Sequence, residues 1–406
     1  MKKYGREVGL IFLYFLIPAL SAVTPLIAIP AITQQYGADG WTSVAIAMSI
    51  GSATAIVAEL GWGVVGPQLV AGADDGERAN IFRRSLASKL VAASIAIPFV
   101  VVATGLLTTT DRAAAIVAAI GFLLTCLSPS WYLIGVSRPG LILLAESVPK
   151  VLLITISAAL ILTGSPLIVY SIAIVISPIL TLLISARVLG VRLARPRELF
   201  SGVRATLRAQ FHLTWGRGVS ALYTALPTTL VALVSPDSVA TFAAADRLMR
   251  MGALVLAGIP NRLQSWIGSA NGPDRIRRSY KSLAMNAALG IVASLSFWLL
   301  APLVSRLVFS GTVILSSELA LVAGLVLLSI CISRGFGLAV VAAGRANWIS
   351  LSVLLSAAIG VPSILLLAAG FGDIGALWGE LIAEGTGILA QLGILVFFAR
   401  RMRRQG

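Results

Sequence analysis

The chain has little charge and almost no cysteine or histidine. Of its 406 residues, 12% are Asp, Glu, Lys or Arg and 58% are hydrophobic, and the mean hydropathy is +0.96. Soluble domains carry roughly 25% charged residues, so this composition excludes a pair of soluble domains and indicates an integral membrane protein. The two cysteines, Cys126 and Cys331, both lie in apolar stretches. They are predicted to be small buried residues, with neither a disulfide nor a metal between them.

Catalytic motifs are equally scarce. The sequence has no Walker A motif, so ATP hydrolysis by that phosphate-binding loop is excluded. The single histidine, His212, has no nucleophile or metal ligand near it in sequence. Residues 61–66 match the G-x-G-x-x-G pattern, but they end an apolar stretch and lack the βαβ unit of a dinucleotide site. We therefore expect no cofactor and no enzymatic activity.

Apolar stretches long enough to cross a membrane recur along the whole chain. A hydrocarbon core of roughly 30 Å needs about 20 helical residues. The first stretch follows Met1-Lys2-Lys3 but is too long for the apolar region of a signal peptide, so it is predicted to be a transmembrane helix. The twelve predicted spans are residues 8–32, 41–65, 87–107, 113–134, 140–162, 167–189, 213–234, 239–261, 283–307, 319–342, 348–369 and 374–398.

The net charge of +15 is unevenly distributed between the two sides of these spans. With the amino terminus inside, most of the 31 Lys and Arg residues belong to the inner side, whereas the outer side has Arg112 and Arg306. The positive-inside rule then places both termini in the cytoplasm, in a multi-pass protein of the plasma or inner membrane. Topology thus accounts for the basic excess. We expect contact with membrane lipids and no nucleic acid partner.

The longest inner segment, Arg187–Gly216, separates six spans from six. We expect an N-terminal six-helix lobe over residues 1–197, an inner amphipathic linker over 198–212 and a C-terminal six-helix lobe over 213–406. Because six is an even number, the two lobes share one orientation, which makes a parallel repeat of the kind found in transporters. The linker has arginines and apolar residues at helical spacing. This pattern is typical of a helix on anionic lipid, and a regulatory or partner-binding segment is the alternative.

Charged residues inside the spans are the most informative feature. A charge at the bilayer centre costs roughly 2.5–3.5 kcal/mol on insertion scales, so it is expected only with a partner or a function. In the eighth span, Asp246, Arg250 and Asn261 share one helical face, and Arg247 is adjacent to it. In the twelfth, Glu384 lies about 15 Å from the outer boundary at a rise of about 1.5 Å per residue, near the midplane. The other candidates are Glu380 in the same span, Arg217 in the seventh, Arg334 in the tenth and Glu59 near the inner end of the second.

These charges have two competing interpretations. In the first, Asp246 pairs with Arg250 or Arg247, Arg334 pairs with a glutamate of the twelfth span, and the pairs only hold helices together. Buried pairs stabilise little relative to apolar packing, which makes this an unfavourable way to join helices. In the second, the charges line a water-accessible cavity between the lobes, where arginines attract an anion and carboxylates balance charge or exchange protons. The sequence favours the second interpretation.

Three segments resemble motifs of polysaccharide (O-antigen type) flippases. Residues 59–63, Glu-Leu-Gly-Trp-Gly, resemble the acidic-x-Gly-aromatic signature that ends the second span of those proteins. Residues 128–135, Ser-Pro-Ser-Trp-Tyr-Leu-Ile-Gly, resemble the segment that closes their fourth span. Residues 242–250, followed by Pro260, are similar to their eighth-span pattern. The order of these motifs and the twelve-span plan resemble the multidrug/oligosaccharidyl-lipid/polysaccharide exporter superfamily.

The resemblance implies an all-α integral membrane protein, with twelve transmembrane helices in two parallel-repeat lobes that form a V-shaped alternating-access transporter. It implies a flippase that moves a lipid-linked oligosaccharide of the undecaprenyl-pyrophosphate type from the cytoplasmic to the outer leaflet, for surface polysaccharide biosynthesis. The expected partners are this lipid-linked glycan, membrane lipids, and a glycan polymerase or glycosyltransferases. With the charges above, the substrate-binding candidates are Arg247, Arg250, Arg334, Arg217 and Asn261, and those for ion coupling or charge balance are Asp246, Glu380, Glu384 and Glu59.

A cation-coupled multidrug exporter of the same superfamily is the alternative function. Such exporters usually need acidic residues in the first lobe for cationic drugs, and the interior of the first span has none. A membrane glycan polymerase or ligase is disfavoured because the short outer loops leave little room for catalytic machinery. A purely structural scaffold does not explain charges near the midplane on two helices.

Overall fold

The computed structural model describes residues 2–190, 202–256, 259, 263–264, 266–267 and 272–403. These residues are helical apart from short connections, so the predicted all-α class is confirmed. The chain divides into two compact units, Met1–Ala221 and Leu222–Gly406. Asn261, one of the predicted site residues, lies outside the described residues.

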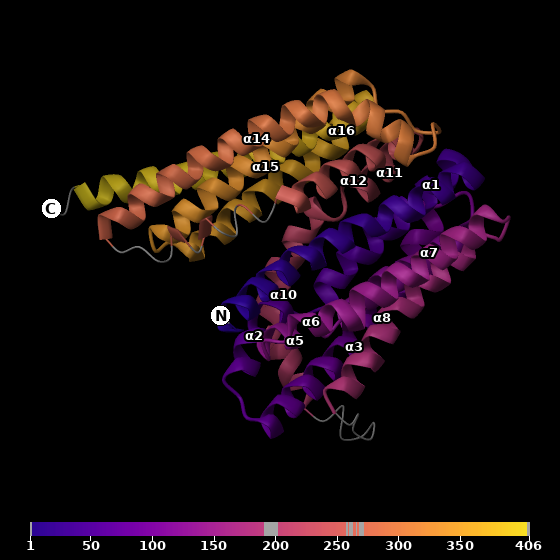
Figure 1. Cartoon of the computed structure of the whole chain (residues 1–406). Coiled ribbons are helices and arrows are strands. Elements are labelled where there is room, and N and C mark those ends of the chain that lie inside the picture. The colour runs from indigo at the N-terminus through magenta and orange to yellow at the C-terminus, as the bar shows by residue number, and fades with distance from the viewer. Residues whose placement is uncertain are drawn as a thin grey trace. The chain divides into compact units, whose positions relative to one another are not determined.

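In the first unit, α1, α7 and α8 run side by side, and α4 packs against α1 and α8 (Figure 1). Ile32, Ile154 and Ile161 are fully buried where these helices meet. The helices are α1 (Lys2–Ala58), α2 (Trp62–Ala71), α3 (Asp75–Leu107), α4 (Arg112–Leu124), α5 (Ser130–Gly135), α6 (Pro139–Ile142), α7 (Val148–Leu162), α8 (Ile168–Val188) and α10 (Val203–Thr224), with the turns η1 (Thr125–Leu127) and η2 (Leu143–Ser147), the second of which is π-helical.

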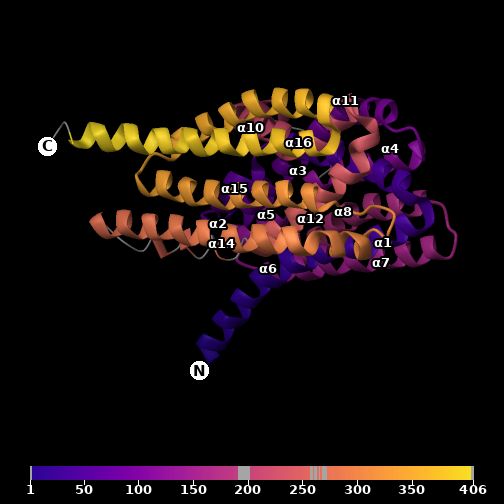
Figure 2. The same ribbon diagram turned by 90° about the horizontal axis from the view of Figure 1, so that it is seen from above.

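In the second unit, α14, α15 and α16 lie side by side along most of their length (Figure 2). The shorter α11 and α12 pack against this layer, and Met249 of α12 is buried against Val326 and Leu327 of α15. The helices are α11 (Pro227–Val234), α12 (Val239–Leu256), α14 (Gly272–Val308), α15 (Ser317–Ala342) and α16 (Ile349–Arg403), with the short 3-10 turns η3 (Pro236–Ser238) and η4 (Ala346–Trp348).

α1 and α16 each join two predicted spans through a single glycine. The backbone turns at Gly37 (φ 64°, ψ −158°) in α1 and at Gly372 (φ 63°, ψ −138°) in α16. Glycine reaches this region without the steric penalty that a Cβ would bring. Both breaks fall in predicted outer loops, residues 33–40 and 370–373. At each of these two places, one helix therefore continues from one predicted span into the next with a turn at a single glycine.

Within the described residues, eight helices are long and apolar enough to cross a membrane, or nine if the bent pair α10 and α11 is one crossing. α1 and α16 are each counted once in this number. α12, which covers most of the predicted eighth span, is not counted because its 18 residues include three charged ones. The protein is thus a multi-pass membrane protein, and the predicted number of twelve spans stays a prediction.

The inner linker joins the seventh span without a break. Residues 203–212 form the beginning of α10, which continues to Thr224, and the boundary between the two units falls at Ala221. The predicted start of the C-terminal lobe, residue 213, comes before this boundary. No proline lies between Pro196 and Pro227 to end a helix, and this explains why helical structure runs on past that position. Residues 191–201 lie outside the described part of the chain.

α3 and α14 each expose an apolar face. Ile95, Phe99 and Leu106 are exposed on α3, and Leu299 and Leu303 are exposed on α14. Contiguous exposed apolar surface of this kind is unfavourable in water but matches hydrocarbon. These faces are therefore assigned to contact with lipid tails.

Close packing of α1 against α4 makes Gly51 sensitive to any added side chain. A Cβ at this position would lie 2.4 Å from the carbonyl oxygen of Ala119 and 2.6 Å from Cβ of Phe122. Because a helix backbone cannot move aside locally, Gly51→Ala is expected to lower the free energy of unfolding by about 1–3 kcal/mol. Thermal unfolding of the purified protein in detergent measures this loss.

The matched control for that substitution is Gly393→Ala in α16. Nothing lies within 4 Å of a Cβ added at Gly393, so the melting temperature is expected to stay unchanged or to rise slightly. Equal melting temperatures for the two variants would contradict the close approach of α1 and α4.

Candidate functional site

Arg250 is held between two carboxylates from two helices of the second unit. Its Nε donates a hydrogen bond to Oδ1 of Asp246 at 2.7 Å, one helical turn earlier on α12. Its Nη2 donates a hydrogen bond to Oε1 of Glu380 on α16 at 3.5 Å. The structure therefore brings together three of the predicted residues, and it links α12 to α16 through charge.

These three side chains are mostly buried. The exposed fraction is 6% for Glu380, 13% for Asp246 and 33% for Arg250. In the described part of the chain, Oε2 of Glu380 is buried and has no hydrogen-bond partner. An unsatisfied buried acceptor is unfavourable, so this oxygen is the place in the group that gains most from a proton, a cation or a donor.

α15 contributes a further cation to the same region. Nη1 of Arg334 donates a hydrogen bond to the carbonyl oxygen of Ala253 on α12 at 3.5 Å. Glu384 of α16 lies within electrostatic range of both Arg250 and Arg334. Arg247, half-buried on α12, is adjacent to Asp246 in sequence. We call these six residues the second-unit cluster: Asp246, Arg247, Arg250, Arg334, Glu380 and Glu384.

Glu59 and Arg217 form a separate ion pair in the first unit. Nη2 of Arg217, on α10, donates a hydrogen bond to Oε2 of Glu59, the residue that follows the end of α1. Both side chains are half-buried. The sequence predicts Arg217 in the seventh span, at the start of the C-terminal lobe, whereas in the structure it belongs to the first unit. Of the predicted site residues, the structure pairs Glu59 with Arg217 in the first unit and brings Asp246, Arg250 and Glu380 together in the second.

The two flippase-like motifs of the first unit pack against each other. Leu60 and Gly61 adopt positive φ, 56° and 74°, and this turn leads into Trp62 of α2. The rings of Trp62 and Trp131 have centroids 5.4 Å apart, and Nε1 of Trp62 donates to Oγ of Ser88 at 3.1 Å. The resemblance thus reflects a physical contact between α2 and α5.

Lys89 is a buried cation beside this contact that the sequence analysis missed. Its Nζ lies 5.5 Å from the centroid of the Trp131 ring, and the residue is 1% exposed. It is within electrostatic range of Glu59 and Arg217. A cation over an indole ring is stabilised by the ring quadrupole. Lys89 falls inside a predicted span, but it had been counted with the positive charge of the inner side.

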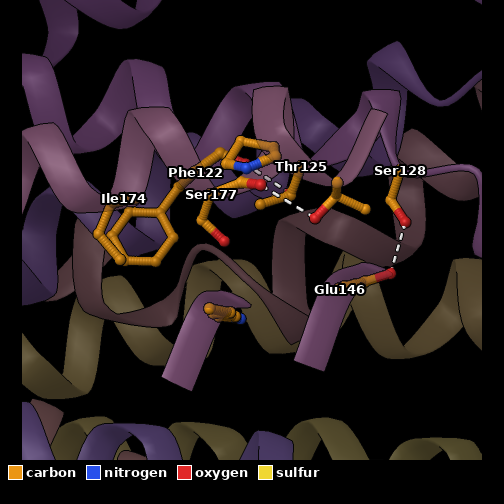
Figure 3. Close-up of a pocket in the computed structure, with 9 residues that line it drawn as sticks. Phe122, Thr125, Ser128, Glu146, Ile174 and Ser177 are labelled. Carbon is orange, nitrogen blue, oxygen red and sulfur yellow. Dashed lines mark hydrogen bonds between the residues drawn. The ribbon is translucent and has the colours of Figure 1, made fainter. Parts of the chain in front are cut away.

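A second polar site that the sequence analysis missed surrounds Glu146. The first unit encloses a cavity of about 40 Å³ there, and Thr125 and Ser177 also line it (Figure 3). Oγ of Ser128 donates to Oε2 of Glu146 at 2.8 Å, and Oγ of Ser130 donates to the same oxygen. Glu146 lies on the π-helical turn η2, and such turns are frequent at functional sites.

The chemistry available to these groups is exchange of ionic and hydrogen-bond partners. The part of the chain that the structure describes has no group of three or more His, Cys, Asp or Glu residues that could hold a metal ion. The second-unit cluster instead combines three guanidinium groups with three carboxylates, which balance when all are ionised. An anion that displaces a carboxylate from an arginine would leave that carboxylate ready to take a cation or a proton.

Solved structures of transporters share the fold of this chain. One is an inward-facing multidrug resistance transporter of the MATE family in the MOP superfamily: the TM-score is 0.69 at 15% identity, over 96% of this chain and 95% of that one. Another is the lipid II flippase MurJ in an inward closed conformation, with a TM-score of 0.70 at 12% identity, over 95% of this chain and 87% of that one. A third is the MATE multidrug transporter DinF-BH in complex with R6G, with a TM-score of 0.59 at 17% identity, over 97% and 94%.

Comparison of the sequence, as opposed to the fold, identifies one family. No curated protein sequence matches the chain. The family model described as "Polysaccharide biosynthesis protein" matches residues 10–262, which include all three flippase-like motifs and end before α14. This match covers more than half of the chain and confirms the resemblance drawn from the motifs. The chain therefore belongs to the polysaccharide biosynthesis protein family, and its fold is that of MOP-superfamily transporters.

Proposed function

We propose that the protein is a flippase that moves a lipid-linked oligosaccharide, of the undecaprenyl-pyrophosphate type, from the cytoplasmic to the outer leaflet of the plasma membrane. The observation that carries the proposal is the position of Arg250 on α12, where it donates hydrogen bonds to both Asp246 and Glu380. Membership of a polysaccharide biosynthesis family supports it. Both termini are proposed to be cytoplasmic, and glycosyltransferases or a glycan polymerase are the proposed partners.

Arg250 is the group that we propose to recognise the pyrophosphate. A guanidinium presents a planar fork of donors, which matches two phosphate oxygens better than a lysine ammonium does. In the structure Asp246 and Glu380 accept from this fork. A pyrophosphate would compete with both carboxylates for Arg250. Substrate binding thus replaces one set of charged hydrogen bonds by another, without leaving the arginine unpaired in the membrane.

The displaced carboxylates supply a route for ion coupling. When Arg250 turns to the substrate, Glu380 keeps a buried oxygen that has no partner in the described residues. A proton or a sodium ion at Glu380 would restore neutrality, and its release would return Arg250 to the carboxylates. The membrane potential also favours outward movement of an anion, by about 2.3 kcal/mol per charge per 100 mV.

Replacement of Arg250 tests recognition of the pyrophosphate. Arg250→Ala is expected to slow translocation at least about tenfold, because a charged hydrogen bond contributes roughly 1.5–3 kcal/mol. Lipid-linked precursor should accumulate on the inner leaflet, which inner-leaflet labelling of the glycan measures. Arg306→Ala, at an exposed arginine near the end of α14, is the control and should leave translocation unchanged.

The amount of protein in the membrane separates a transport defect from a folding defect. Arg250→Lys keeps a cation between the two carboxylates, so this variant should reach the membrane even if Arg250→Ala does not. Its translocation is expected to lie between those of wild type and Arg250→Ala. Normal surface glycan in Arg250→Ala at normal protein abundance would show that the pairs of the second-unit cluster only hold helices together.

Replacement of Glu380 tests the coupling. Glu380→Gln has nearly the same shape but cannot exchange a proton or bind a sodium ion as a carboxylate does. Translocation by proteoliposomes should then lose its dependence on the imposed gradient, while Glu318→Gln at the exposed start of α15 should keep it. Wild-type transport that is indifferent to both the pH gradient and the sodium gradient would refute coupling.

The fold likeness to MATE transporters favours one second candidate, a cation-coupled multidrug exporter. The two functions predict different phenotypes for deletion of the gene. We expect altered surface glycan and unchanged resistance to cationic dyes. Lost dye resistance with unaltered glycan would instead favour the multidrug exporter.

A further inference from the structure

An open cavity of about 540 Å³ lies at the end of the first unit where α3 begins and α8 ends. Three arginines line it: Arg78 and Arg83 of α3, and Arg138 of the turn between α5 and α6. Asp75 lines it as well. With these four side chains ionised, the lining has an excess of two positive charges.

Asp75 does little to neutralise the cavity. Nη1 of Arg78 donates a hydrogen bond to Oδ1 of Asp75 at 3.2 Å, but the Asp75 side chain is 99% exposed. Ion pairs at such exposure are weak because water and salt screen them. Nε of Arg78 donates to the carbonyl oxygen of Val70 at 3.0 Å. This second bond orients the guanidinium at the cavity wall, so the arginine is positioned before any ligand arrives.

The lining also includes a hydrogen-bonded turn and an aromatic side chain. Ser137 has a φ of 55°, and the backbone N–H of Arg138 donates to the carbonyl oxygen of Leu133 at 3.0 Å. These features fix the turn, while the Arg138 side chain is exposed. Tyr132, a further lining residue, is buried in edge-on contact with Phe82, with ring centroids 5.4 Å apart. Its hydroxyl adds a neutral donor to the lining.

We propose that this cavity binds a phosphate-bearing anion, as carried by the headgroup of an anionic phospholipid in the inner leaflet. Arginines from separate elements suit the several oxygens of a phosphate, and a cavity of this volume suits a headgroup-sized ligand. The cavity lies beside the ends of two spanning helices, where headgroups are expected, and basic pockets at that level attract anionic lipids. The proposal concerns the first unit alone and does not rest on the proposed substrate, while the assignment of this end to the inner leaflet rests on the positive-inside rule.

Lipid binding by the purified full-length protein tests the proposal. The variant combines Arg83→Gln with Arg138→Gln, and the control is Arg84→Gln, an exposed arginine of the same helix that is outside the lining. Native mass spectrometry counts phosphatidylglycerol retained against phosphatidylcholine. We expect wild type and Arg84→Gln to retain phosphatidylglycerol selectively, and the double variant to bind it at least about tenfold more weakly.

Soluble pyrophosphate distinguishes the two sources of phosphate. If millimolar pyrophosphate displaces phosphatidylglycerol from wild type, the cavity takes the phosphate group from either source. If it does not displace the lipid, while the double variant still loses it, the headgroup is the ligand. Both results support the proposal.

Two results would overturn the proposal: unchanged lipid retention in the double variant, or an equal loss in Arg84→Gln, which would show only general attraction to surface charge. The melting temperature in phosphatidylcholine checks folding. If the double variant does not fold, the single variant Arg138→Gln carries the test, since its side chain is exposed and its loss leaves no buried group unpaired. This variant should also lose selective retention of phosphatidylglycerol.

Discussion

A charge inside an apolar helix is costly unless a neighbouring group compensates it, and this constraint accounts for the ion pairs of the protein. Arg250 has Asp246 and Glu380, and Arg217 has Glu59. Another helix brings Glu380 close to Arg250, and the end of α1 brings Glu59 close to Arg217. The packing of α12 against α16 is therefore also a condition for keeping Arg250 paired inside the second unit.

Because it must stay paired, Arg250 has two carboxylates within reach, Asp246 and Glu380. Apolar packing, as between Met249 and Val326, has one best arrangement and holds α12 to α15. An arginine with two acceptors on two helices can change partners while it stays paired. A transporter needs both properties, because its helices must remain folded while a charged ligand enters and leaves. α12 combines an apolar contact through Met249 with the ion pairs of the second-unit cluster.

Much of this could be predicted from the sequence because helical periodicity is local. Asp246 and Arg250 are four residues apart, so their contact follows from α-helix geometry. The predicted outer loops over residues 33–40 and 370–373 locate the turns of α1 and α16, but not that a single glycine makes each turn within one helix. The contact between Arg250 and Glu380 could not be predicted, since 130 residues separate them and packing decides which glutamate approaches. Lys89 and Glu146 were missed for a different reason. Each lies near the inner end of a predicted span, and there the sequence alone does not separate a buried side chain from a loop residue.

The burial of Lys89 also determines how the first unit meets reagents from the aqueous phase. Its amine lies against the Trp131 ring and is almost completely shielded from solvent. A water-soluble acylating reagent can reach this amine only when α3 and α5 separate, whereas Lys281, which is exposed, reacts at once. Acylation of Lys89 therefore records opening of the first unit, so the native chain contains its own chemical reporter of that motion.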